Sequence, residues 1–337
     1  MHKGFALNWV VSGDGNTSLF GNGDVELLVE AGVQITRFDI RLGGHADWDS
    51  AILGHYQAVV SQLKAAHIDV IGLLGAGIVA GAQQKDWNAN AAEQGSTQLD
   101  NTFLADYASN ASIIAGELQD ITLWELWNEP NQWDAFPDPH GGPDQPGGSY
   151  IFPSLYARLL RRTYPLIKQL PNGGTVITGG VYGHDGAPNA SSGHDYLQSV
   201  LQYLHQLPLA GDPLPFDAVG QHLYLNQGAG AQAQHLAGYL DLIGSLAGGR
   251  SIYVTEAGWR TGPGGVTVDQ QAGNLAMLFQ ACGVSDQTVA ATCWFELYDN
   301  PQARADQQTY GVVMAPPAGQ PPAAGQHKPA FAAFQAV

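Results

Sequence analysis

Eight short apolar runs, separated by segments with helical periodicity, constrain the fold of this 337-residue chain more than any other feature. The predicted strands span residues 5–9, 34–40, 69–74, 121–127, 175–179, 218–223, 251–256 and 290–295. The predicted helices span residues 24–31, 56–67, 101–118, 153–170, 194–206, 232–246 and 269–282, with a last short helix at 329–336. Repeated strand–helix alternation predicts parallel strands joined by helical crossovers. A closed (β/α)8 TIM barrel, an α/β fold, accounts for the number of strands and the length, and a doubly wound open sheet is the alternative.

The chain is predicted to form one catalytic domain over residues 1–337. Apolar residues make up 45% of it and charged residues 13%, which is enough for a large core. The Pro- and Gly-rich stretch in residues 131–152 follows the fourth strand closely, so it is interpreted as a long loop beside the site and not as a domain boundary. No stretch approaches the ~20 apolar residues of a membrane span.

Acidic residues outnumber basic ones by 30 to 13, which gives a formal net charge of −17. This charge argues against nucleic acid and anionic membranes as partners, because both would be repelled. A neutral oligo- or polysaccharide meets no such objection. Met1 leads within a few residues into a strand-like segment, so no signal peptide is predicted. The low lysine content suits a secreted or acid-tolerant enzyme. The sequence leaves localisation open, with a secreted or periplasmic protein as the options, and it leaves the oligomeric state open as well.

The sequence predicts no metal and no cofactor. No Cys/His spacing typical of a metal site is present, and neither is a Gly-x-Ser-x-Gly nucleophile elbow. The two cysteines, Cys282 and Cys293, either pair or remain separate buried thiols, and the second interpretation is favoured.

Two glutamates stand at the ends of apolar runs. Glu129 lies in residues 123–131 (LWELWNEPN), and Glu256 lies in residues 252–259 (IYVTEAGW). The carboxyl ends of barrel strands meet at one rim, where the chemistry of such folds is placed. Two carboxylates at one rim can divide the work of glycoside cleavage, one giving a proton to the leaving oxygen and the other attacking or activating water. The alternative is two unrelated acids that face solvent.

Further polar and aromatic residues stand at or near other strand ends. The second strand carries Arg37 and Arg41, the sixth ends near His222 and Tyr224, and Asn128 precedes Glu129. The eighth strand supplies Trp294 and Glu296. In a barrel these side chains would converge with the two acids.

Several of these segments resemble clan A of the glycoside hydrolases, the retaining barrel enzymes. The resemblance includes the two glutamate segments, residues 33–39 (VQITRFD) and residues 216–224 (FDAVGQHLY). Residues 156–168, Pro171, the pair at 179–180 and residues 310–312 (YGV) are most similar to family 39, the β-xylosidase-type branch, and family 5-like members share much of the pattern. The resemblance spans nearly the whole chain. Exo-acting members of that branch often carry an extra β-sandwich, and none is expected in a chain of this length.

The resemblance implies that Glu256 is the nucleophile and Glu129 the acid/base. A nucleophilic carboxylate must stay ionised, and the resemblance implies that Arg37 and Tyr224 hold it so. An acid/base must be protonated at working pH, which burial and a nearby negative charge would favour. Asn128 can bind the sugar 2-hydroxyl, or merely end the strand.

His222 can bind a sugar hydroxyl, position a carboxylate or pack as a core histidine, and the resemblance implies the first. Trp294 is a candidate stacking surface for the apolar face of a sugar, or ordinary barrel packing. Glu296, two residues on, is a candidate for an outer hydroxyl. Further aromatic candidates on loops are Trp48, Trp87, Trp133, Phe136, Tyr182 and Trp259.

The sequence therefore predicts a retaining glycoside hydrolase that cleaves β-linked glycosides by double displacement. The expected separation of its two carboxyl groups is about 5–5.5 Å, against ~6.5–9.5 Å for an inverting enzyme. A non-catalytic carbohydrate-binding barrel and a transglycosylase that uses the same residues are the alternatives. The sugar, the linkage and exo or endo action stay open, with exo action slightly favoured.

Overall fold

Eight parallel strands close into a barrel, with each strand hydrogen-bonded to the next and β8 to β1. The computed structural model describes residues 1–7, 10–91, 100–132, 148–183, 193–206, 214–224, 232–304, 307–315 and 325–337. The strands are β1 (His2–Leu7), β2 (Ile35–Asp39), β3 (Asp69–Leu74), β4 (Leu123–Asn128), β5 (Thr175–Gly183), β6 (Val219–Leu223), β7 (Ile252–Ala257) and β8 (Val289–Phe295). The predicted single-domain (β/α)8 barrel is confirmed.

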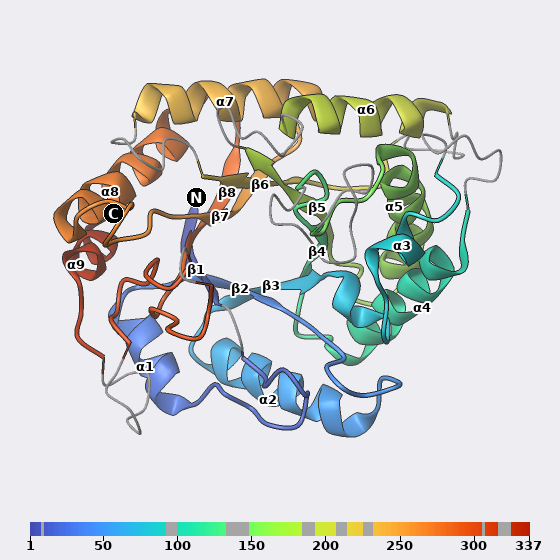
Figure 1. The fold of residues 1–337 in the computed structure, drawn as a ribbon, viewed down its shortest axis with the longest axis horizontal. Coiled ribbons are helices and arrows are strands. Elements are labelled where there is room, and N and C mark those ends of the chain that lie inside the picture. Colours follow the sequence, from blue (N-terminus) through green and yellow to red (C-terminus); the bar gives the residue numbers. More distant parts are fainter. Residues whose placement is uncertain are drawn as a thin grey trace.

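The helices surround this barrel (Figure 1). They are α1 (Asn22–Glu30), α2 (Ser50–Ala65), α3 (Gln84–Trp87), α4 (Thr102–Glu117), α5 (Pro153–Lys168), α6 (Gly193–Gln206), α7 (Ala233–Leu246), α8 (Val268–Val284) and α9 (Pro329–Ala336), with a 3₁₀ turn η1 (Ala76–Ile78) after β3. Among the described residues, no helix is both long enough and apolar enough to span a bilayer.

Element boundaries differ from the predicted ones where local pairing or capping decides them. β1 begins at His2 because it pairs with β8 from that residue on, and residues 8–9 of the predicted strand lie outside the described ones. α2 begins at Ser50, six residues earlier than predicted, because the Asp49 carboxylate accepts hydrogen bonds from two backbone N–H groups of the first turn. The short elements α3 and η1 had no clear periodic signal in the sequence.

Apolar side chains fill two separate layers. The barrel interior holds a small cluster to which β1, β2, β3, β5 and β8 contribute, with Leu123, Tyr253 and Phe295 packed against it. A much larger cluster lies between the strands and the helices. The two cysteines belong to different layers, Cys293 inside the barrel and Cys282 outside it on α8, and both are free thiols, as favoured above.

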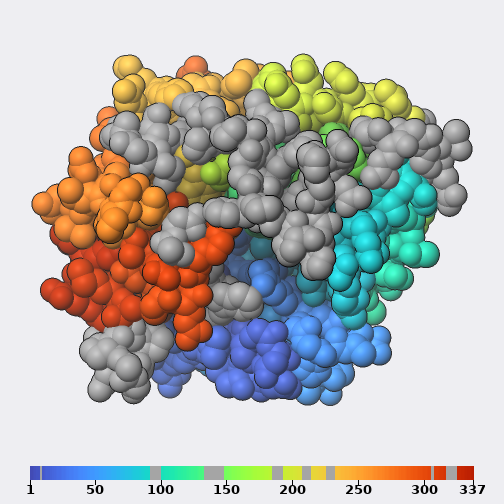
Figure 2. Space-filling view, in the orientation of Figure 1, coloured from blue at the N-terminus to red at the C-terminus, as the bar shows by residue number. Residues whose placement is uncertain are grey.

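The two ends of the chain close the barrel together. Figure 2 shows the orange-red C-terminal segments beside the blue N-terminal ones. Phe334 of α9 is fully buried, and its ring stacks on that of Phe5 in β1 with 4.3 Å between centroids. Lys3 adds a hydrogen bond of 2.8 Å from Nζ to the carbonyl oxygen of Phe334. α9 therefore covers the outer face of β1.

Removing the Phe334 ring is expected to weaken this closure. Phe334→Ala leaves a cavity against Phe5 and should lower the free energy of unfolding by about 3–5 kcal/mol, measured by urea unfolding. The control is Val337→Ala, since Val337 is 42% exposed and should change stability little. An unchanged midpoint for Phe334→Ala would show that α9 is not part of the core.

Candidate active site

A buried ion pair inside the barrel supports the site from below. Arg37 of β2 donates from Nε to Oε2 of Glu125 in β4 at 2.6 Å, and the two side chains are 5% and 0% exposed. The other oxygen of Glu125 accepts hydrogen bonds from Gly180 N at 2.8 Å and from Thr255 Oγ1 at 3.0 Å. A buried carboxylate is tolerated only when its oxygens are matched in this way. Glu125 therefore holds Arg37 in one orientation.

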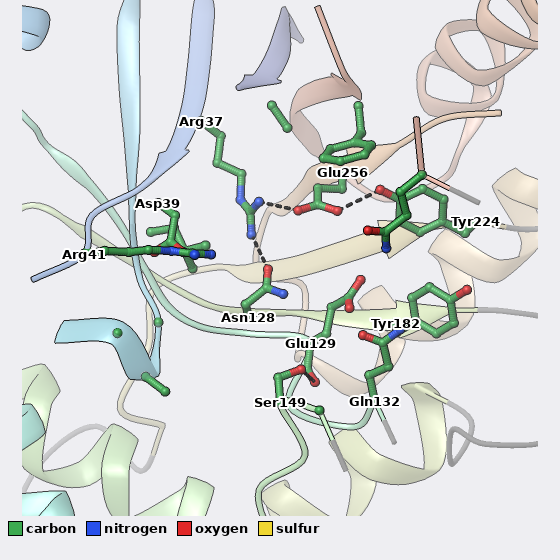
Figure 3. Close-up of a pocket in the computed structure, with 18 of the residues that line it drawn as sticks. Arg37, Asp39, Arg41, Asn128, Glu129, Gln132, Ser149, Tyr182, Tyr224 and Glu256 are labelled. Atoms are coloured by element: carbon green, nitrogen blue, oxygen red, sulfur yellow. Dashed lines mark hydrogen bonds and ion pairs between the residues drawn. The ribbon is translucent and has the colours of Figure 1, made fainter. Parts of the chain in front are cut away.

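The same guanidinium reaches the rim of the barrel. Arg37 donates from Nη1 to Oε1 of Glu256 at 2.5 Å and from Nη2 to Oδ1 of Asn128 at 2.8 Å, as Figure 3 shows. The amide nitrogen of Asn128 then points away from Arg37 into the pocket (Figure 3). One side chain of β2 therefore fixes two residues from β4 and β7.

Glu256 lies at the end of β7, where the pairing becomes irregular. The register shifts on the β6 side between Gln221 and His222 and on the β8 side between Val254 and Ala257. Such irregularities near sites re-aim a side chain. Tyr224, just past β6, donates its hydroxyl to Oε2 of Glu256 at 2.7 Å. Both oxygens of this carboxylate are therefore held by donors.

Glu129 reaches the rim through unusual backbone angles. Trp127 has φ of 82° and Glu129 has φ of 42°, in the left-handed region that few residues other than glycine adopt. The first of these angles breaks the alternation of β4, so the ring of Trp127 joins the outer layer and Asn128 faces the pocket. Ser149 donates its hydroxyl to the Glu129 carbonyl oxygen at 2.9 Å. Such backbone strain is found at functional sites, where the surroundings must enforce it.

His222 is fully buried between the two acids. Its Nδ1 lies 2.8 Å from Oε1 of Glu129 and 3.6 Å from Oε2 of Glu256. A Cβ atom on Gly180 would come within 2.3 Å of Nε2 of this ring, so the imidazole needs glycine at that position of β5. The ring does not line the pocket, so His222 is not placed to bind a sugar hydroxyl. Its position fits the second role considered, which is to position a carboxylate.

The two carboxylates lie close together. One oxygen of Glu129, one of Glu256 and a ring nitrogen of His222 all lie within 4.8 Å of one another. Three such donors could also ligate a metal ion. The Arg37 guanidinium on Glu256, however, places a positive charge where a cation would bind, and His222 is already bonded to Glu129. The arrangement suits proton transfer between the side chains better than metal ligation.

The surroundings drive the two pKa values in opposite directions. Burial raises the pKa of Glu129, and the charge of Glu256 adds to this effect while His222 opposes it. Burial also acts to raise the pKa of Glu256, but the positive charges of His222 and Arg37 and the Tyr224 hydrogen bond outweigh it and lower that pKa. Two carboxyls with pKa values displaced in this way are suited to be an acid and an anion at the same pH.

Glu129 and Glu256 line a pocket of about 600 Å³, a size typical of small-molecule sites. Arg37, Asn128, Glu129, Tyr224 and Glu256, all predicted from the sequence, belong to its wall. Of the aromatic candidates, the pocket includes Trp87 and Tyr182 but neither Trp48 nor Trp259, and the other two lie outside the described residues. The rest of the wall is formed by Ala6, Leu7, Asp39, Arg41, Leu73, Gly75, Ala76, Gly77, Gln132, Gly148, Ser149, Phe295, Arg304, Gln307 and Tyr310.

The structure corrects the roles expected of Trp294 and Glu296. Trp294 is fully buried in the outer layer, where its ring packs on Trp259 with 5.9 Å between centroids, so no sugar can stack on it. Ala291, Cys293 and Phe295 are the residues of β8 that face inward, and Phe295 lines the pocket. Glu296 is 2% exposed and does not line the pocket, so a contact with an outer hydroxyl is not available to it.

Two acidic residues of the site were not predicted, although both lie in segments quoted above. Glu125 stands in the middle of an apolar strand, two residues after Leu123, at a position whose side chain must face the barrel interior. An acid at such a position needs a buried cation, and Arg37 faces the same interior from β2. This pairing could have been found from strand parity. Asp39, at the end of β2, lines the pocket.

Comparisons with known proteins bear on the fold. No protein-family model matches the sequence, and no curated protein matches it. Among solved structures, a family 39 glycoside hydrolase from Bacteroides cellulosilyticus has a TM-score of 0.62 at 16% identity, with 99% of this chain and 62% of that one aligned. This chain therefore spans about three fifths of that protein's length.

Two β-glucosidases of family 1 are also similar. The enzyme from the fungus Humicola insolens has a TM-score of 0.68 at 15% identity and is aligned over 99% of this chain and 96% of its own. The enzyme from Thermotoga maritima has a TM-score of 0.62 at 13% identity, over 100% and 96%. This chain therefore shares the barrel fold of clan A glycoside hydrolases.

Neutralising Glu125 is expected to destabilise the whole site. Glu125→Gln leaves the buried charge of Arg37 without its partner inside the barrel, so the free energy of unfolding should fall by about 3–5 kcal/mol in urea titrations. Asp47→Asn, which removes the same charge from an exposed position, is the matched control. Equal stability of the two variants would mean that the Arg37–Glu125 pair does not support the site.

Proposed function

We propose that this chain hydrolyses β-linked glycosides with retention of anomeric configuration. The observation that carries the proposal is the separation of the two carboxylates, whose nearest oxygens lie within 4.8 Å. Retaining glycosidases place their carboxyl groups ~5–5.5 Å apart, whereas inverting ones need ~6.5–9.5 Å to admit a water molecule between them. The short separation favours direct attack by a carboxylate on the sugar.

The first half of the reaction uses both acids at once. Glu256, held as an anion by Arg37 and Tyr224, attacks the anomeric carbon through a carboxylate oxygen. The glycosidic bond breaks as Glu129 gives its proton to the departing oxygen, and a covalent glycosyl–enzyme remains. Asn128 can donate its amide to the sugar 2-hydroxyl, a contact that strengthens as positive charge develops on the ring.

The second half reverses these roles. Glu129, now an anion, removes a proton from a water molecule as that water attacks the anomeric carbon. The bond to Glu256 breaks, and the sugar leaves with its original configuration. His222 remains bonded to Glu129 and limits the movement of the carboxylate between the two steps. A sugar hydroxyl in place of water would give transglycosylation with the same residues.

Two observations favour an enzyme over a non-catalytic carbohydrate-binding barrel. Both acids are present, and their pKa values are shifted in opposite directions, which binding alone does not require. The strained backbone at Glu129 is also explained if the protein must hold the carboxyl group in one fixed position, as catalysis requires. The similar solved structures include two β-glucosidases, which adds support from the fold.

Removing either carboxyl should abolish turnover of 4-nitrophenyl β-glycosides. Glu256→Ala and Glu129→Ala are each expected to lower kcat by at least about a thousandfold, because each loses a group that acts in the transition state. Glu26→Ala, which removes an exposed acid from α1, is the control.

Azide distinguishes the two roles. It fills the space left in Glu256→Ala and should restore activity with an α-glycosyl azide as product, since a single displacement inverts the configuration. Absence of rescue at Glu256 together with rescue at another acid would assign the nucleophile elsewhere.

The pH profile of kcat/KM should be bell-shaped. Activity is lost as pH falls through the lowered pKa of Glu256, which must be ionised, and as pH rises through the raised pKa of Glu129, which must be protonated. Tyr224→Phe removes a hydrogen bond to the Glu256 anion and should move the acid limb to higher pH while leaving the alkaline limb nearly in place. A shift of the alkaline limb alone would contradict this assignment.

A further inference from the structure

A second polar pair lies in the same pocket and has no part in the reaction described above. Asp39, the last residue of β2, accepts a hydrogen bond from Nε of Arg41 through its Oδ2 atom. Both residues line the pocket. Figure 3 shows them on the opposite side of Asn128 from Tyr182 and Gln132.

The other oxygen of Asp39 lacks a partner. Oδ1 is buried and accepts no hydrogen bond from any residue that the structure describes. Burial raises the pKa of Asp39, although Arg41 and Arg37 oppose the shift. A buried carboxylate oxygen without a donor costs stability, and such exceptions in folded proteins need an explanation. A substrate hydroxyl is a donor of the right kind.

Small residues leave room for a ligand beside this pair. The pocket wall continues through Gly75, Ala76 and Gly77 after β3. A Cβ atom on Gly75 would lie 3.6 Å from Oδ1 of Asp39, and one on Gly77 would lie 3.2 Å from Cγ of Arg41. Side chains at these two positions would occupy the space next to the pair, and glycine keeps that space open.

The charges around the pocket argue for a neutral ligand. Three arginines line it, of which Arg37 is matched by Glu125 and Glu256, and Arg41 is matched by Asp39. Neither Arg37 nor Arg41 therefore offers an unmatched positive charge to a sugar acid beside Asp39. The negative charge of Asp39 would itself repel a carboxylate on the substrate.

We propose that Asp39 and Arg41 form a subsite that binds neighbouring hydroxyl groups of a neutral sugar on the glycone side of the cleaved bond. Asp39 accepts a hydrogen bond from one hydroxyl, and Arg41 donates one to the next. This assignment rests on the proposed function, because Glu129 protonates the leaving oxygen and so marks the aglycone side. Asn128 separates Glu129 from the Asp39–Arg41 pair (Figure 3), which places the pair on the glycone side.

Kinetics with two leaving groups tests the subsite. Wild type, Asp39→Asn and the exposed control Asp47→Asn are assayed with 4-nitrophenyl and 2,4-dinitrophenyl β-glycosides of xylose, glucose, galactose, mannose and glucuronic acid. For the best neutral glycone, Asp39→Asn should lower kcat/KM by at least about tenfold, and by the same factor with both leaving groups. Asp47→Asn should match wild type, and the glucuronides should be poor substrates.

Three results would overturn the subsite: an unchanged kcat/KM for Asp39→Asn, a loss seen with one leaving group only, or a preference for glucuronides. Melting temperatures establish that the variants are folded. If Asp39→Asn fails to fold, Arg41→Lys provides a second test, because the Arg41 side chain is half-exposed. This variant should also lower kcat/KM.

Failure of the subsite and failure of the proposed function give different results. If Glu256→Ala is inactive while Asp39→Asn equals wild type, the subsite is wrong and the hydrolase remains. If wild type hydrolyses none of the glycosides, the proposed function fails. Calorimetric binding of the five free sugars then decides the subsite: binding at least about tenfold weaker in Asp39→Asn supports it, and equal binding overturns it.

Discussion

The guanidinium of Arg37 is the group on which the rest of the site depends. It bonds Glu125 inside the barrel and both Asn128 and Glu256 at the rim. Burial works against its charge, but Glu125 and Glu256 more than offset this and raise its pKa, so the cation persists at any working pH. Because a buried cation must keep its partners, three strands are held in one relative position. The precision of the rim therefore derives from an ion pair beneath it.

This arrangement makes the site electrostatically asymmetric. Glu256 accepts hydrogen bonds from Arg37 and Tyr224. Among the described residues, the carboxyl group of Glu129 has a hydrogen bond with His222 only, and it lies close to the negative charge of Glu256. Burial raises the pKa of Glu129. Burial acts on Glu256 in the same way, but its positive neighbours and the Tyr224 hydrogen bond lower the pKa of Glu256 instead. The same pocket therefore favours the protonated form of one acid and the ionised form of the other, which is the division of labour that acid–base and nucleophilic catalysis require.

The strands and the position of both acids at the rim were predictable because they depend on local patterns. Apolar runs form buried strands, and a barrel brings their ends together whatever the details of pairing. Trp294 was expected on the wrong face of β8, because an aromatic side chain suits either face and one residue separates the inner face from the outer. The inward turn of Asn128 depends on the positive φ of Trp127, which no composition rule signals. The burial of His222 likewise depends on a register shift in β6 and on Gly180.

The central claim is that Glu256 and Glu129 act in two successive displacements at one carbon. Proton NMR of the first sugar released, recorded before mutarotation mixes the anomers, tests this most directly. A substrate hydrolysed by this chain should give the β-anomer first. Initial release of the α-anomer would contradict the account, since it would require a single displacement by water across carboxylates that stand too close together to admit it.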